Sequence, residues 1–182
     1  MDKREEKSIK QIHDAFARLI SLKDYNDITI QDILDESKVS RSTFYAHYKT
    51  KNDLLLSISN HIFDHVFSHS LQEEKTHDYS KDNFYDYHHL IEHIFYHVQD
   101  EKDLFKGILG NEIFLNEFRN HIYKLVNSYY NNFLYRDQRI PLELKKATAV
   151  DNFITILNYW IKKDFTDSPE EIASYYINLT FY

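Results

Sequence analysis

The chain has 182 residues, with only two glycines, two prolines and no cysteine. So few turn-forming residues favour long helices over a sheet fold, and the missing thiols exclude a disulfide framework, cysteine nucleophiles and cysteine-ligated zinc. The formal net charge of −7 argues at first against nucleic acid, but residues 1–58 hold ten basic and ten acidic residues, whereas residues 59–182 hold 12 and 19. A neutral N-terminal part on an acidic body is compatible with DNA binding, because attraction to phosphates acts over about 8 Å at physiological salt.

The N-terminus is charged and leads into an amphipathic helix, so nothing in it resembles a signal peptide. No apolar run approaches the length of a membrane span. We therefore expect a soluble, cytoplasmic protein.

The first predicted helix covers about residues 5–22, and two short helices follow it. Thr29 is the expected N-cap of the first short helix, with Asp32 reaching back to it. Residues 37–39 are a break of the length that joins two helices at a steep angle, and Ser40 is a fresh N-cap. This arrangement predicts a helix-turn-helix.

The second short helix presents hydroxyls, an imidazole and a guanidinium outward, with almost no acid. Such a surface suits DNA phosphates and base edges. The outward residues are Arg41, Ser42, Thr43, Tyr45, His47 and Tyr48.

The same stretch resembles the N-terminal domain of the TetR family of bacterial transcriptional regulators. The matching residues are Thr29, Ile30, Asp32, Ile33, Val39, Ser40, Thr43, Phe44, Tyr45, His47, Tyr48, Lys51, Leu54 and Leu55. Lys38 departs from the pattern, because the family usually has glycine in the turn. Either Lys38 adopts a left-handed conformation, at a cost of about 1 kcal/mol, or the turn is slightly altered.

The resemblance implies an all-α protein with a three-helix DNA-binding domain over residues 1–50 and a helical regulatory and dimerisation domain over residues 51–182. It implies a homodimeric repressor that binds palindromic operator DNA and responds to a small-molecule effector. The residues expected to face bases are Arg41, Ser42 and Thr43, with Gln31 as a further candidate. The residues expected to hold phosphates are Thr29, Ser40, Tyr45, His47, Tyr48 and Lys51.

A long helix is predicted from about residue 51 to residue 74, capped by Thr50 or Asn52, and residues 75–83 read as a loop. Further helices are expected near 83–99, 101–110, 112–135, 142–164 and 169–181, which makes about nine in all. This part also resembles a TetR subgroup found near genes of the dihydroxyacetone kinase type. The last two helices carry too much apolar surface for one contact face, and we expect one stripe to be left for the partner in the dimer. The apolar residues are Val150, Ile154, Leu157 and Ile161, then Phe153, Ile156 and Trp160, and then Ile172, Tyr175, Tyr176 and Leu179.

Four polar residues of the C-terminal part are predicted to point inward and to line a ligand cavity: Tyr87, His88, His121 and Tyr129. A largely apolar pocket with a few polar groups is how small ligands are held. The alternative is that each is a core residue bonded to the backbone.

Two histidine triplets recur at every fourth residue, a spacing that lets two side chains grip one metal ion. His89, His93 and His97 are predicted to be solvated, so His61, His65 and His69 are the better candidates. A metal-binding helical sensor or enzyme therefore stays open as an alternative, as does a DNA-binding module without a ligand. No cofactor is predicted, and with neither a glycine-rich phosphate loop nor a motif-placed catalytic set we expect no enzyme.

Overall fold

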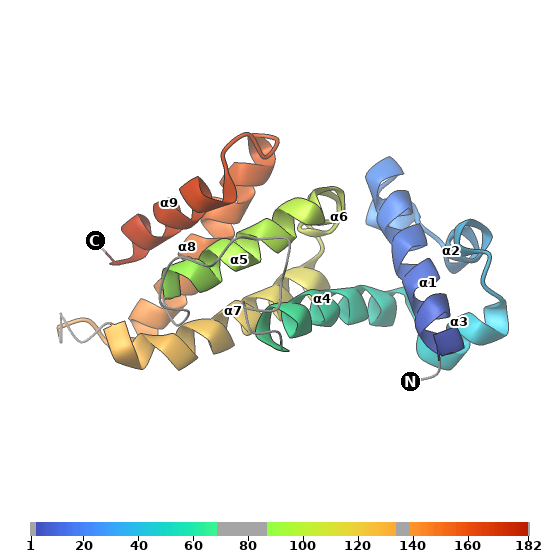
Figure 1. Ribbon diagram of the computed structural model, residues 1–182, viewed down its shortest axis with the longest axis horizontal. Helices are drawn as coiled ribbons and strands as arrows, with labels where there is room; N and C mark the ends of the chain where they lie inside the picture. Colours follow the sequence, from blue (N-terminus) through green and yellow to red (C-terminus); the bar gives the residue numbers. More distant parts are fainter. Residues whose placement is uncertain (1–2, 69–86, 134–138, 182) are drawn as a thin grey trace. The chain divides into compact units, whose positions relative to one another are not determined.

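The computed structural model describes residues 3–68, 87–133 and 139–181, without the side chains of residues 62–68 and 129–133. Within these ranges the chain forms nine α-helices, one short 3₁₀ helix and no strand, which confirms the all-α prediction (Figure 1). The helices are α1 (Lys3–Leu22), η1 (Tyr25–Asp27), α2 (Ile30–Ser37), α3 (Arg41–His47), α4 (Lys51–Ser68), α5 (Tyr87–Asp100), α6 (Lys102–Ile108), α7 (Glu112–Phe133), α8 (Leu142–Lys162) and α9 (Pro169–Phe181). The predicted loop at 75–83 lies outside the described residues.

The chain folds into two compact units. The first comprises Met1–His61 and Asp103–Glu117, and the second comprises Ile62–Lys102 and Phe118–Tyr182. Most of α6 and the first turns of α7 thus belong to the same unit as the helix-turn-helix. The functional division at residue 50 remains a prediction.

Helix α1 packs against both α2 and α3 in the first unit. Its apolar side chains recur at helical spacing, so they share one face, and Ile12 and Phe16 on this face are fully buried. Ile33 from α2 and Phe44 from α3 are fully buried as well. Removing this apolar surface from water holds the two short helices at a fixed angle.

Capping boxes begin α2, α4 and α9, and the one at α2 is predicted from the sequence. In each, a hydroxyl accepts a hydrogen bond from a backbone N–H three residues later, and the acid at that position accepts one from the cap. For α9, the Ser168 hydroxyl accepts from the Glu171 N–H at 3.3 Å, and the Glu171 carboxylate accepts from the Ser168 N–H at 2.8 Å. Thr50 and Asp53 form the equivalent pair at α4, which selects Thr50 over Asn52 as the cap.

Lys38 lies in the left-handed region, with φ 58° and ψ 21°. Its N–H donates to the Leu34 carbonyl oxygen at 3.0 Å and ends α2. The first of the two conformations expected for Lys38 is therefore confirmed, and the turn keeps its geometry without a glycine.

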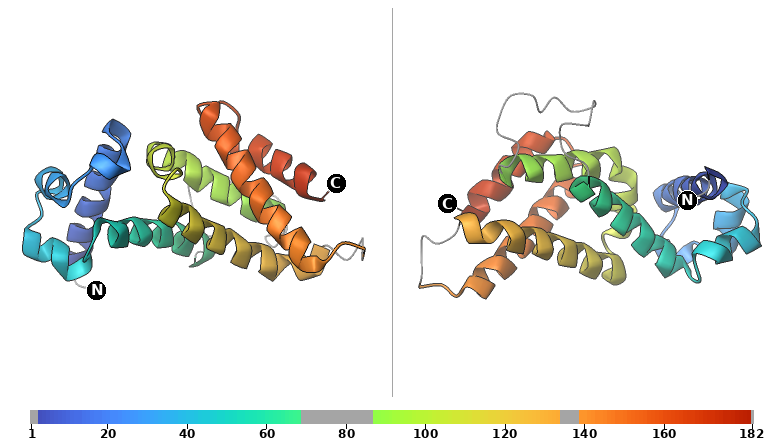
Figure 2. Two further views of the ribbon diagram at one scale, coloured as in Figure 1. Left: turned by 180° about the vertical axis from the view of Figure 1, so that it is seen from behind. Right: turned by 60° about the horizontal axis from the view of Figure 1, so that its bottom comes forward.

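In the second unit α9 lies along both α5 and α8, as the two views of Figure 2 show. The core between them is aromatic. Phe95 of α5 stacks on Phe153 of α8 with ring centroids 4.7 Å apart, and the edge of Trp160 meets Phe95 at 5.6 Å. The Trp160 indole N–H donates to the Asp167 carbonyl oxygen at 2.9 Å, so the turn into α9 is tied to this core.

The prediction that one face of α5 is solvated is wrong. His93 is fully buried, and His89 and His97 are half-buried. The helical wheel assumes a helix with one face in solvent, but every residue of α5 except Asp100 is buried or half-buried.

The structure buries most of both apolar stripes of α8, so neither of these stripes is the one left for a partner. Val150, Ile154 and Leu157 of one stripe and Phe153 and Trp160 of the other are all buried. Neighbouring helices of the same unit cover them. The large apolar groups that α8 and α9 leave exposed are Leu142, Leu144 and Tyr159 of α8 and Tyr175 and Leu179 of α9.

Candidate nucleic-acid interface

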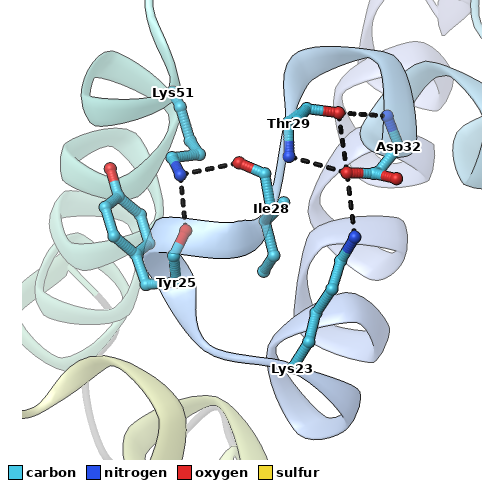
Figure 3. A network of polar contacts seen from close by, with 6 residues as sticks. All are labelled: Lys23, Tyr25, Ile28, Thr29, Asp32 and Lys51. Carbon is cyan, nitrogen blue, oxygen red and sulfur yellow. Dashed lines mark hydrogen bonds and ion pairs between the residues drawn. The ribbon is translucent and has the colours of Figure 1, made fainter.

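The start of α2 is held by a network around the Asp32 carboxylate (Figure 3). Asp32 accepts hydrogen bonds from the Thr29 N–H and hydroxyl, each at 2.7 Å, and forms an ion pair with Lys23 at 2.9 Å. The bond from the Thr29 hydroxyl, followed by that from Lys23, holds the pKa of Asp32 well below its usual range. Thr29 is exposed, but its side chain is committed to this cap, as the sequence predicts.

The ammonium group of Lys51, at the first position of α4, points toward the backbone of the segment before α2 (Figure 3). The ammonium donates to the carbonyl oxygens of Tyr25 and of Ile28, the latter at 2.6 Å, and lies 4.1 Å from the centre of the Tyr25 ring. Burial lowers the pKa of Lys51. Lys51, which is predicted to contact a phosphate, is therefore already bonded within the protein, where it joins α4 to the segment before α2.

Three hydroxyls cluster at the start of α3. The Ser40 oxygen accepts from the Thr43 N–H at 3.1 Å and lies 2.7 Å from the Thr43 hydroxyl and 2.9 Å from that of Ser42. This confirms Ser40 as the N-cap. It also brings three predicted DNA contacts together at one helix end, where exposed N–H groups favour an anion.

Arg41 and Gln31 meet across the turn. The Arg41 Nη2 donates to the Gln31 Oε1 at 2.9 Å, and both side chains are exposed. The structure thus brings together Arg41, which is predicted to face a base, and Gln31, the further candidate for that role.

The remaining predicted contacts differ in exposure. Tyr45 is exposed, with its ring held edge-on against Phe44 at 5.5 Å. His47 is half-buried and its Nδ1 lies 3.9 Å from the Glu5 carboxylate, a pair that is ionic when the imidazole is protonated.

Tyr48 is buried, and its hydroxyl lies 3.0 Å from the His13 Nε2 and 3.4 Å from the Ser57 hydroxyl. Burial raises the pKa of this phenol.

Sequence reasoning missed two partners of these residues. Asp35 accepts a hydrogen bond from Gln31 Nε2 at 2.9 Å, and the spacing of four residues on one helix was a signal that could have indicated it. His13 precedes Tyr48 by 35 positions. Nothing local in the sequence links them.

The predicted ligand residues occupy different settings within the second unit. Tyr87 is buried, with its hydroxyl 2.8 Å from that of Tyr176. His88 and His121 are half-buried, and the Nδ1 of His88 lies 3.4 Å from the Glu92 carboxylate. The side chain of Tyr129 lies outside the described residues.

In the part of the chain that the structure describes, no three histidine, aspartate or glutamate side chains converge to hold a metal ion. His61 is exposed, and the side chains of His65 and His69 are outside that part. The described helices also include none that is long and apolar enough to cross a membrane.

A capped helix, a left-handed turn and a second capped helix with outward hydroxyls and a guanidinium define a helix-turn-helix DNA-binding protein. The family comparisons agree with that class. Residues 12–58 match the family described as "Bacterial regulatory proteins, tetR family", and residues 85–181 match the family described as "Transcriptional regulator C-terminal region". The chain belongs to the TetR family of transcriptional regulators.

Relatives and solved structures of this family cover different shares of the chain. The HTH-type transcriptional regulator YuxN of Bacillus subtilis (strain 168) is 32% identical over 89 residues, which is 46% of this chain and 31% of that protein. An HTH-type transcriptional regulator of Haemophilus influenzae is 25% identical over 73% of this chain and 69% of its own length.

Among solved structures, a TetR transcriptional regulator from Streptococcus agalactiae 2603V superposes with a TM-score of 0.74 and 26% identity, over 100% of this chain and 97% of that one. The dihydroxyacetone kinase operon activator DhaS has the same fold, with a TM-score of 0.65 and 18% identity over 95% of this chain and 93% of its own. The protein is therefore a DNA-binding transcriptional regulator and not an enzyme.

Proposed function

We propose that the protein is a cytoplasmic repressor that binds a palindromic operator as a homodimer and is released by a small-molecule effector. Residues 1–50 read the DNA, and residues 51–182 carry the regulatory and dimerisation functions. The observation that carries the proposal is the exposed start of α3, where Arg41 stands beside the hydroxyls of Ser40, Ser42 and Thr43. Such groups match base edges and phosphates in the major groove.

The homodimer is supported by the apolar groups that α8 and α9 expose. Tyr159 is 41% exposed, Tyr175 40% and Leu179 57%, and the two tyrosine rings lie 6.4 Å apart. Covering such a patch with the same patch of a second chain gives a two-fold dimer, which presents two reading heads to a palindrome. The half-sites would then lie about 34 Å apart or a multiple of that.

Release by an effector requires that the ligand bind more tightly when the two DNA-binding domains of the dimer have a spacing that does not fit the operator than when their spacing fits it. Helix α4 is the proposed lever, because it starts in the first unit at Lys51 and continues into the second. The proposed effector contacts are Tyr87, His88, His121 and Tyr129.

Selecting bound DNA from a random pool tests the proposal. We expect a palindrome whose half-sites are one helical turn or a multiple apart, and light scattering of the protein alone at twice the mass of one chain. A pool that enriches no sequence would contradict operator binding. Loss of operator affinity on adding an effector from a compound screen, together with increased expression of a reporter, would support release and repression.

A further inference from the structure

The interface contains a hydrogen-bonded relay of three exposed side chains, Asp35, Gln31 and Arg41. Gln31 Nε2 donates to the Asp35 Oδ1 at 2.9 Å, and Arg41 Nη2 donates to the Gln31 Oε1 at 2.9 Å. The first bond lies within α2 and the second crosses from α3 to α2. The relay therefore ties the side chain of the first residue of α3 to the preceding helix.

The direction of both bonds is fixed by the chemistry of the two ends. An ionised carboxylate only accepts hydrogen bonds, and a guanidinium only donates them. The Gln31 amide must therefore present its N–H to Asp35 and its oxygen to Arg41, because the flipped amide would lose both bonds. Asp35 thereby sets which end of Gln31 faces the guanidinium.

Gln31 is consequently a poor candidate for reading a base itself. A glutamine reads adenine by donating and accepting through the same two atoms at once, Nε2 and Oε1. Here these two atoms are engaged with Asp35 and Arg41. Arg41 uses one of its five N–H donors on Gln31 and has the planar fork that pairs with guanine O6 and N7.

We propose that Gln31 and Asp35 are positioning residues that hold Arg41 for reading one guanine in each operator half-site. This inference rests on the proposed operator binding. An arginine side chain has many rotamers, and fixing it before DNA arrives lowers the ordering cost of the contact. The relay should therefore affect base preference at the Arg41 position and leave the rest of the site unchanged.

The chain offers a matched pair of variants at Asp35. Both Asp35→Ala and Asp35→Asn remove the acidic charge near DNA, so both change general attraction to phosphates equally. The asparagine keeps an oxygen that accepts from Gln31, and the alanine does not. A difference between these two variants isolates the hydrogen bond from the charge.

The experiment measures affinity at one salt concentration for the selected operator and for its substitutions at each base pair. We expect the wild type to prefer G·C at one position by roughly 5- to 150-fold and Arg41→Ala to lose that preference. Gln31→Ala and Asp35→Ala should reduce it by about fivefold or more, and Asp35→Asn should keep it within about twofold. Thermal unfolding of each variant and its affinity for random DNA separate this effect from loss of fold.

The possible failures are distinct. If the wild type selects no site, operator binding itself fails. If Arg41→Ala loses the preference while Gln31→Ala and Asp35→Ala retain it, the relay is not what positions Arg41. A changed preference at a different base pair in Gln31→Ala would show that Gln31 reads a base directly, and this too would overturn the proposal.

Discussion

The hydroxyl of Tyr48, at the end of α3, lies 3.0 Å from the Nε2 of His13 in α1, so a residue predicted to hold a phosphate is bonded to the interior of its own unit. Tyr48 is 5% exposed. Tyr48→Phe removes the hydroxyl and leaves the ring packing intact. We expect it to lower the free energy of unfolding by about 1 kcal/mol, because His13 loses a partner, with little change in DNA affinity.

Urea unfolding and operator binding, both measured well below the melting temperature, check this prediction. Tyr45→Phe is the matched control for stability, since the Tyr45 side chain is exposed and loss of its hydroxyl should leave the free energy of unfolding unchanged. An unchanged stability of Tyr48→Phe with a tenfold weaker operator complex would instead assign its hydroxyl to the DNA.

His13 also makes stability depend on pH. Burial, followed by repulsion from His61, lowers its pKa from 6.5 to about 4, with Asp14 opposing the shift. The folded state binds the proton less well than the unfolded state. The contribution of His13 to the free energy of unfolding is therefore fully present above pH 6.5 and is lost as the pH is lowered toward 4. The loss from this one group is up to about 3 kcal/mol.

The measurement is urea unfolding between pH 7.5 and 4.5 for the wild type and His13→Gln, which does not titrate and keeps a polar group for Tyr48. We expect a flatter profile for the variant. Asp32 does not interfere: its pKa is lowered from 3.8, so its contribution is present above that pH and is lost only below it. Parallel profiles for the two proteins would refute the assignment to His13.

Lys38 adopts its left-handed conformation at φ 58° without being glycine. We expect Lys38→Gly to raise the free energy of unfolding by about 1 kcal/mol, because glycine carries no Cβ penalty there. Lys38→Ala removes the same charge and keeps the Cβ, so it should show no gain. Equal stability of the two variants would mean that the lysine conformation is not strained.

Local signals account for what the sequence predicts well in this protein. Each helix cap depends on residues three apart, as at Thr29 and Asp32. The left-handed conformation of Lys38 was one of two alternatives that the sequence left open. Interactions across long separations were not predictable. The Tyr48 hydroxyl points inward because it meets His13, which is distant in the sequence. The Lys51 ammonium points inward because it meets backbone carbonyl groups, and the side chains of a sequence do not reveal where such groups lie.

Helix α6 approaches α1 at Gly107, and this too has no local signal. A Cβ at Gly107 would lie 2.0 Å from the Ile20 Cγ2 and 3.0 Å from the Ile20 carbonyl oxygen. The Ile20 side chain is branched at Cβ and buried, so it has little freedom to move away. We expect Gly107→Ala to lower the free energy of unfolding by about 1 to 3 kcal/mol.

Gly110→Ala is the control for Gly107→Ala, because an added Cβ there meets nothing within 4 Å and its φ is not positive. It should be neutral or slightly stabilising. Chemical denaturation of both variants provides the comparison. If the added Cβ meets Ile20, the combined loss of Ile20→Ala and Gly107→Ala should be smaller than the sum of the two single losses. Equal stability of the two alanine variants would mean that α6 does not pack on α1 this closely.

Arg41 and Lys51 are predicted to contribute to DNA binding in different ways. Arg41→Ala should lower the preference for operator over random DNA by about 1 to 3 kcal/mol, because it removes a base contact. Lys51→Ala should weaken all duplexes by a similar factor and reduce the salt slope by about one, because it removes a phosphate contact. Lys51→Ala should also destabilise the fold, since the ammonium bonds the carbonyl oxygens of Tyr25 and Ile28.

Titrations of operator and random duplexes at several salt concentrations separate the two effects, and unfolding measurements show whether Lys51→Ala remains folded at the assay temperature. Lys49→Ala supplies a matched control, because Lys49 is an exposed lysine two positions earlier. An unchanged salt slope in Lys51→Ala, combined with a loss of stability, would mean that the inward ammonium acts on the fold alone. Equal losses on operator and random DNA for both Arg41→Ala and Lys51→Ala would contradict the division between base and phosphate contacts.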